Sequence, residues 1–276
     1  MAKSESSARI VTSVVAVISA VALAVSLVAT GFAACAVPDV STKALASAYS
    51  FDDASPFTKD ELVAAAVQTK RYTIEDNDKA AVYATIAAIN AQEALAGTAG
   101  KGAPKIDVTA NYAAGELSDE QIATLEAAFD AASERYVLTP DAVSHLDDVF
   151  GVVQAAKWWL LAAVVAACVG CTATAFRGGK RVLGRVLAGA GVSVLAVFAL
   201  LAAWVAVDFD GFFAQFHSLF FAAGTWTFSW DSLLICMYPP EFWVGMGAIW
   251  LVVTVACCVV CITIGRLLRK GSTQKR

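Results

Sequence analysis

Histidines are the side chains best suited to proton transfer near neutral pH. This 276-residue chain contains only two of them. An imidazole gains or loses its proton near pH 6.5, so it can act as an acid or a base at neutral pH. His145 lies in the stretch SHLDDV, and His217 lies in QFHSLFF about seventy residues later. Both have carboxylates close in sequence, namely Asp147, Asp148, Asp208, Asp210 and Asp231. This combination is typical of general acid–base catalysis.

Other catalytic motifs are missing from the sequence, which narrows the chemistry. It has no G-x-S-x-G nucleophile elbow, no H-E-x-x-H zinc motif, no P-loop and no G-x-G-x-x-G motif. Three alternatives stay open: a serine–histidine pair through Ser144 or Ser218, a nucleophilic Cys236, and a metal held by both histidines and an aspartate. Neighbouring side chains on a helix point away from each other, which disfavours the serine pairs. We expect acid–base chemistry with no metal and no cofactor.

The elements that position these histidines are predicted to cross a membrane. The chain is 58% hydrophobic and 16% charged, with a mean hydropathy of +0.65, and is far more apolar than a soluble domain. Four segments are long enough to cross about 30 Å of hydrocarbon as helices. They are Ile10–Ala34, Trp158 or a few residues earlier to Phe176, Val182–Val207 and Trp243–Gly265. The predicted fold class is mainly α, a polytopic membrane protein with four transmembrane helices.

The distribution of charge predicts which helix ends face the cytoplasm, where Lys and Arg accumulate in short segments. The N-terminus, the turn between the second and third spans, and the C-terminal tail hold 11 of the 20 basic residues. Glu5 is the one acidic residue there, and the other segments hold 23 of the 24 acidic residues. We therefore expect both termini in the cytoplasm. Nothing in the basic segments indicates nucleic acid binding.

The first apolar segment has a second interpretation, a lipoprotein signal peptide. Lys3 and Arg9 precede an apolar run that ends before Cys35, as they would in such a peptide. The run is about 25 residues long, whereas a signal peptide has about 7 to 15 apolar residues. We therefore predict an uncleaved transmembrane helix. The cysteines within the spans are expected to pack as small hydrophobic residues.

The segment boundaries predict three regions. Residues 1–37 form the N-terminal tail and first transmembrane helix, and residues 38–148 form an extracellular, mostly helical domain. Residues 149–276 hold transmembrane helices 2–4, an aromatic interfacial segment at 208–242 and a basic cytoplasmic tail. Aromatic rings collect at membrane interfaces, and residues 208–242 contain eleven of them.

Local signals predict where the helices of the 38–148 domain begin and end. The stretches beginning at Thr58 and at Ser118 are capping boxes, in which a hydroxyl and a carboxylate or amide three residues later satisfy each other's backbone donors. An apolar stripe between residues 77 and 96 predicts a helix that Gly97 ends. Thr139 and Pro140 should begin a helix that runs into the second span. The stretch Ile106–Tyr112 is predicted to be a short strand.

Both histidines are expected at the outer membrane face. His217 lies on the same helical face as Phe213 and Phe220 within the aromatic segment. His145 comes to the outer interface if the hydrocarbon begins near Val149, which is the geometry we favour. The two imidazoles would then lie at one level of the membrane and could act on one substrate.

Several motifs carry a resemblance to a known family. SHLDDV precedes one span, and FHSLFF, TWTF and DSLLICMYPPEFW precede another. This layout resembles the four-helix integral membrane family of the lipoprotein intramolecular transacylases. The resemblance implies that His145 and His217 are catalytic and that Asp148, Asp231 and Trp226 support them. The chain departs from the family at Phe150, where many members have a basic residue, and at the paired prolines 239–240.

The resemblance also implies a function. A family member would move an ester-linked acyl chain of a bacterial lipoprotein's diacylglyceryl group to the amine of its N-terminal cysteine. The partners would be membrane lipid and a diacylated lipoprotein in the bacterial cell membrane, with no cofactor. The alternative is a non-enzymatic membrane protein whose outer domain binds an envelope or lipoprotein partner. A metal-dependent hydrolase of lipid head groups is a third possibility.

Overall fold

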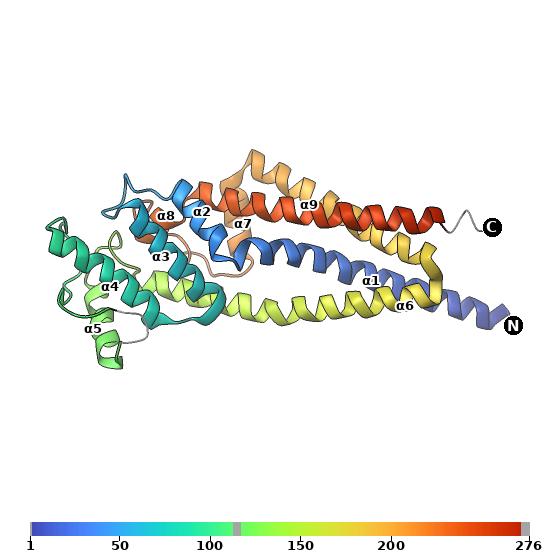
Figure 1. The fold of residues 1–276 in the computed structure, drawn as a ribbon, viewed down its shortest axis with the longest axis horizontal. Coiled ribbons are helices and arrows are strands. Elements are labelled where there is room, and N and C mark those ends of the chain that lie inside the picture. Colours follow the sequence, from blue (N-terminus) through green and yellow to red (C-terminus); the bar gives the residue numbers. More distant parts are fainter. Residues whose placement is uncertain (1, 113–116, 272–276) are drawn as a thin grey trace. The chain divides into compact units, whose positions relative to one another are not determined.

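The computed structural model describes residues 2–112 and 117–271, and within these ranges the chain is helical with no strand. The helices confirm the mainly α fold class. In chain order they are α1 (Ala2–Ala36), α2 (Asp39–Tyr49), α3 (Lys59–Arg71), the π-helix η1 (Tyr72–Asp76), α4 (Lys79–Ala96), α5 (Asp119–Asp130), α6 (Pro140–Val207), α7 (Phe209–Ser218), α8 (Leu233–Met237) and α9 (Pro240–Gly271) (Figure 1).

The predicted strand at Ile106–Tyr112 is wrong, and the reason is local. The carboxylate of Asp107 accepts hydrogen bonds from the backbone N–H and the hydroxyl of Thr109, at 2.9 and 2.7 Å. Tyr112 donates its hydroxyl to the backbone carbonyl of Asp107. An aspartate that bonds its own neighbours in this way favours a turn over an extended strand.

Contacts divide the chain into two compact units. The first, which we call the apolar unit, comprises Met1–Ala34, Ala155–Ala214 and Ala248–Arg276. The second, the histidine unit, comprises Cys35–Gln154 and Gln215–Gly247 and contains both histidines. Most of the aromatic segment predicted at 208–242 therefore groups with the residues that precede the second span.

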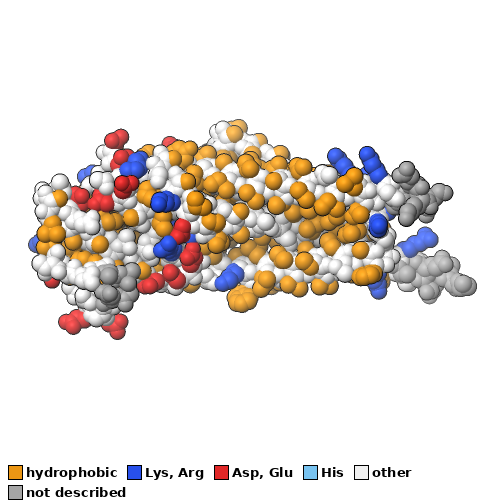
Figure 2. Space-filling view, in the orientation of Figure 1, with side chains coloured by type: hydrophobic (Ala, Val, Ile, Leu, Met, Phe, Trp, Pro, Cys, Tyr) orange, Lys and Arg blue, Asp and Glu red, His pale blue; other side chains and the backbone are white. Residues whose placement is uncertain are grey.

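Helices α1, α6 and α9 are long and apolar enough to cross a membrane, over Arg9–Ala36, Pro140–Val207 and Pro240–Gly271. Figure 2 shows hydrophobic side chains covering the long helices, with Lys and Arg gathered toward one end of them. The last turn of α9 contains Arg269 and Lys270. The chain is a multi-pass membrane protein.

Helix α6 is two helical halves joined at Gly179, whose backbone is not helical (φ 69°, ψ −178°). Figure 1 shows α6 doubling back on itself between its two halves. Beyond it, the second half packs closely on α9, because a Cβ added to Gly184 would lie 2.5 Å from the backbone oxygen of Gly265. The first half contacts α1, where the hydroxyls of Ser19 and Thr174 lie 3.3 Å apart.

Several helices of the histidine unit begin or end where a local signal predicts it. Both capping boxes are present, at Thr58 with Glu61 and at Ser118 with Gln121. Helix α4 ends at Gly97, whose positive φ of 74° glycine tolerates well. The hydrophobic core of this unit combines side chains from α2 to α6 with others from α8 and the start of α9, such as Met237 and Phe242. Residues far apart in sequence therefore share one core.

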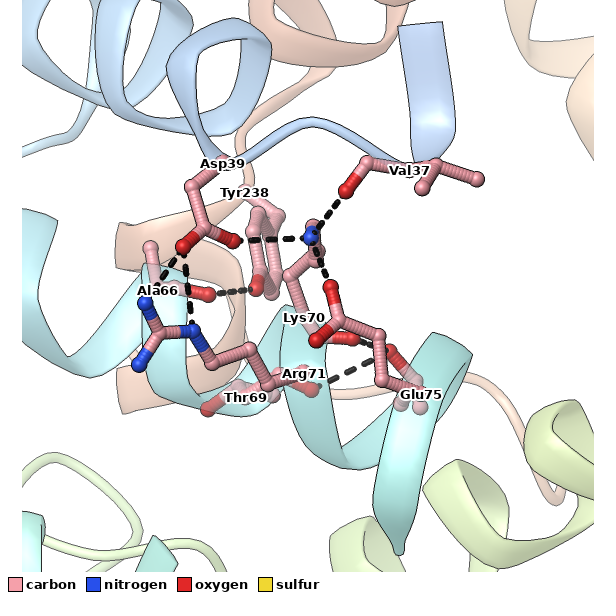
Figure 3. Close-up of polar contacts among 9 residues, drawn as sticks. Val37, Asp39, Ala66, Thr69, Lys70, Arg71, Glu75 and Tyr238 are labelled. Carbon is pink, nitrogen blue, oxygen red and sulfur yellow. Dashed lines mark hydrogen bonds and ion pairs between the residues drawn. The ribbon is translucent and has the colours of Figure 1, made fainter. Parts of the chain in front are cut away.

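A buried lysine joins several of these elements (Figure 3). The side chain of Lys70 in α3 is 5% exposed, and its ammonium group donates to the carbonyl of Val37 and to the carboxylates of Asp39 and Glu75. Arg71 also binds Asp39, so Arg71 and then Lys70 lower the pKa of this carboxyl to about 2. A buried charge is stable only when it is paired. This cluster therefore holds α2 and η1 against α3.

Candidate functional site

The two histidine rings lie close together in the histidine unit. Their centroids are 6.2 Å apart and their planes are inclined by 31°. His145 comes from the second turn of α6, and His217 from the last turn of α7. His145 is buried, with 8% of its surface exposed, whereas His217 is half-buried.

The start of α6 fixes the position of His145. Thr139 caps the helix by accepting a hydrogen bond from Ala142 N–H at 3.3 Å. Leu146 anchors one face of the helix in the core. On the other side, Asp147 accepts hydrogen bonds from Tyr72 in η1 and from the amide of Asn77 at 3.0 Å. The turn that carries His145 is therefore held between the core and η1.

A tight turn after α7 folds aromatic side chains back over His217. The carbonyl of His217 accepts hydrogen bonds from the backbone N–H groups of Phe220 and Phe221, at 3.0 and 2.9 Å. Gly224, with φ of 87°, then reverses the chain in a conformation that favours glycine. The chain returns so that the Trp226 ring lies 4.9 Å from the His217 ring.

Three aromatic rings, Phe221, Trp226 and Phe228, surround the imidazoles and are called the aromatic cap below. Phe221 touches both histidines, with ring centroids 4.9 Å from His145 and 5.8 Å from His217. Phe228 lies 5.8 Å from His145. The ring neighbours of the imidazoles are therefore mainly aromatic side chains and each other.

This environment disfavours a proton on His145, which lies in the part of α6 before the apolar stretch. Burial and then the neighbouring His217 lower the pKa of His145, and Asp148 partly opposes them. The Nδ1 atom of His145 is buried and accepts no hydrogen bond from the part of the chain that the structure describes. A neutral imidazole with an available ring nitrogen can take up a proton from a bound molecule.

Comparison with known proteins decides the family. The family model described as lipoprotein intramolecular transacylase Lit matches residues 77–243, which is more than half of the chain. The chain belongs to the Lit family. No curated protein matches it.

Solved structures of a family member share the fold. The integral membrane lipoprotein intramolecular transacylase Lit from Bacillus cereus superposes with a TM-score of 0.61 at 16% identity, over 96% of this chain and 98% of that chain. Two variants of the same protein, with a histidine replaced by arginine or by alanine, give the same TM-score at 14% identity. They cover 96% of this chain and 95% and 96% of theirs. At this identity the likeness establishes a common fold.

The three residues that the resemblance predicts to support the histidines differ in how close they lie to them. Trp226 packs against His217, with the two ring planes inclined by 33°. Asp148 is exposed and lies one turn from His145, where its negative charge acts on the imidazole. Asp231 pairs instead with Arg135, at 3.4 Å.

The structure also bears on the alternatives to acid–base chemistry. Burial raises the pKa of the Cys236 thiol to about 11, so this thiol is a poor nucleophile at neutral pH. Ser218 donates its hydroxyl to the backbone carbonyl of Gln215 at 2.8 Å. Within residues 2–112 and 117–271, no three His, Cys, Asp or Glu side chains come together in a way that could hold a metal.

Tyr72, Asn77 and Arg135 help to build the site, and sequence analysis missed them. The partners of Tyr72 and Asn77 lie some seventy residues away in sequence, and η1 carries no distinctive pattern. Arg135 reaches Asp231, nearly one hundred residues later. No local signal in one sequence reports such pairs.

Proposed function

We propose that this chain is a lipoprotein intramolecular transacylase. It moves an ester-linked acyl chain from the diacylglyceryl group of a bacterial lipoprotein to the α-amine of the N-terminal cysteine. The observation that carries the proposal is the distance of 6.2 Å between the ring centroids of the only two histidines. Both rings lie in one compact unit of a chain that belongs to the Lit family. The match of residues 77–243 spans both histidines.

The reaction needs one proton removed and one delivered. The amine, with a pKa near 8, attacks the ester carbonyl in its neutral form, and its nitrogen must lose one proton to become the amide. As the new C–N bond forms and the C–O bond breaks, the glyceryl oxygen must gain a proton. Both groups belong to one substrate molecule, so holding them in contact supplies several kcal/mol by proximity.

In this mechanism the two imidazoles divide the proton transfers. His145 is the base, because its lowered pKa keeps it neutral at pH 7 and its Nδ1 is available. His217 is the acid that protonates the leaving glyceryl oxygen. General base catalysis and general acid catalysis each raise a reaction rate by a factor of roughly 10² to 10⁴.

The supporting residues act through the histidines. Asp148 stabilises the imidazolium that forms on His145, because it is the nearby charge that raises the pKa of this ring. Trp226 holds the orientation of the His217 ring by packing against it. Asp231 acts indirectly: its ion pair with Arg135 holds the loop that carries Trp226 and Phe228.

The membrane arrangement is part of the same proposal. Counting the halves of α6 on each side of Gly179 separately gives four spans with both termini in the cytoplasm. The basic residues at the turn around Gly179 and at the end of α9 support this orientation. The 38–148 domain and the histidines then face the outer leaflet, where a diacylated lipoprotein is anchored.

The test is N-terminal acylation of a reporter lipoprotein in cells that express the chain. Mass spectrometry of the N-terminal peptide should find one acyl chain on the cysteine amine and one on the glyceryl group. The His145→Asn and His217→Asn variants, expressed at the same level, should leave the amine free and both ester chains in place. Wild-type yields in both variants would refute the catalytic role.

A further inference from the structure

The aromatic cap packs against both imidazoles. Phe221 lies against both rings, Phe228 lies against His145, and Trp226 lies against His217. All three cap residues are half-buried, so each has one side toward an imidazole and another side exposed. His145 itself is buried, with only 8% of its surface exposed.

An acyl transferase of this kind has a competing reaction. A base that takes a proton from an amine can also take one from water, and water can attack the same ester carbonyl. The products would then be a free fatty acid and a lyso-lipoprotein whose amine is still free. Closing a site with apolar groups expels water and suppresses hydrolysis.

We propose that the aromatic cap, and Phe221 above all, makes this site a transferase rather than a hydrolase. This inference rests on the function proposed above. When Phe221 is reduced to alanine, water enters beside the imidazoles. Its oxygen then bonds to the ester carbonyl carbon as the bond to the glyceryl oxygen breaks. One imidazole takes the proton from water, and the other gives a proton to the glyceryl oxygen.

The position of Phe221 in the turn is what assigns it this role. Its backbone N–H donates to the carbonyl of His217, so the turn that holds the histidine also sets the direction of the phenylalanine. Its ring lies edge-on to His145, at an interplanar angle of 74°. No other cap ring contacts both imidazoles among the described ring pairs.

Phe220 provides a matched control. It has the same side chain in the same turn, and its backbone N–H also donates to the His217 carbonyl. Its ring is 48% exposed and packs on Phe216 and Phe221, at 5.4 and 6.1 Å. Truncating it removes a similar apolar area without removing a ring that lies on His145.

The experiment uses the full-length protein in lipid nanodiscs with a synthetic diacylated lipopeptide in ¹⁸O-labelled water. Transfer leaves the mass of the lipopeptide unchanged and blocks its amine against an amine-reactive reagent. Hydrolysis lowers the mass of the lipopeptide and releases a fatty acid that carries one ¹⁸O. The quantity measured is the ratio of labelled fatty acid to amine-acylated product.

Phe221→Ala should raise this ratio by roughly tenfold or more, because water gains access to the imidazoles. Phe221→Leu, which keeps an apolar side chain over the rings, and Phe220→Ala should keep the wild-type ratio. Phe228→Ala removes the other cap ring that contacts His145 and should also raise the ratio. It keeps the inference testable if the Phe221→Ala protein does not fold. The inference is overturned if neither Phe221→Ala nor Phe228→Ala raises the ratio, including the case in which both products vanish.

Failure of the proposed function gives a different result. A wild-type protein that forms no amine-acylated product would refute the transacylase itself and the inference with it. A wild-type protein that transfers normally, with an unchanged ratio in both cap variants, would refute only the inference.

Discussion

The protonation of His145 is the residue-scale property on which the mechanism depends. Its lowered pKa results from burial and from His217, and Asp148 is the group that moves the pKa the other way. Because its pKa is lowered, His145 is still mostly neutral at pH 6.5, the ordinary pKa of an imidazole. The fall of activity at acid pH, the acid limb of the profile, should therefore lie below pH 6.5. Asp148 thus offers a way to move the limb in a known direction.

The Asp148→Asn variant should shift the acid limb of activity to lower pH. Removing the carboxylate makes the imidazolium less stable, so the pKa of His145 falls further and a lower pH is needed to protonate it. Because Asp148 is exposed, we expect a shift of less than about one pH unit. The measurement is the pH dependence of the transfer rate at saturating lipopeptide.

Asp141→Asn is the matched control for this prediction. It removes one carboxylate from the first turn of the same helix, and the residue is likewise exposed. Its profile should coincide with that of the wild type. A limb that moves to higher pH in Asp148→Asn, or that does not move, would contradict the electrostatic role.

The candidate residues could be chosen from the sequence because their chemistry is rare in this chain. Two histidines among so many apolar residues stand out, and the motifs around them supplied Asp148, Asp231 and Trp226. What these residues contact could not be predicted. Asp231, for example, pairs with Arg135, which comes from a different part of the chain.

At the scale of elements, helix boundaries were predictable where the sequence contains a capping motif. The capping boxes at Thr58 and Ser118 and the glycine stop at Gly97 are local signals, and the structure contains all three. Helix α2 and the π-helix η1 were missed. Lys70 joins α2 to α3 through Asp39, which lies 31 residues earlier, and joins η1 to α3 through Glu75, which lies five residues later. The pair with Asp39 is a tertiary contact that no local signal predicts.

The turn within α6 yields an element-scale prediction. The backbone of Gly179 (φ 69°, ψ −178°) lies in a region that residues with a Cβ almost never adopt. Gly179→Ala should therefore destabilise the protein by about 1–3 kcal/mol. Thermal unfolding in detergent measures the loss.

Gly189→Ala is the control for Gly179→Ala. A Cβ at Gly189, in the second half of α6, meets nothing within 4 Å. Alanine favours a helix over glycine, so this variant should unfold at the wild-type temperature or slightly above it. Equal unfolding temperatures for Gly179→Ala and the wild type would show that the reversal does not depend on glycine.

At the scale of the whole molecule, composition was sufficient to predict a helical, multi-pass membrane protein. The grouping of residues 215–247 with residues 35–154 was not predictable, because it results from side chains such as Met237 and Phe242 joining a distant core. Hydropathy reports how a segment partitions between water and lipid. It does not report which other segment it packs against.

The proposed orientation can be tested with single cysteines in a background whose seven native cysteines are replaced. Lys101 and Lys180 are both exposed, and they lie in the 38–148 domain and at the turn within α6. A membrane-impermeant maleimide should label Lys101→Cys in intact cells and should label Lys180→Cys only after permeabilisation. The reverse pattern would contradict the orientation.

The most direct test of the central claim is the rate of amine acylation of a diacylated lipopeptide by four purified proteins. These are the wild type, His145→Asn, His217→Asn and the double variant. If the two imidazoles act together on one substrate, each single variant should lose roughly 10² to 10⁴ in rate, and the double variant should be little slower than the slower single variant. A wild-type rate in either single variant would contradict the account.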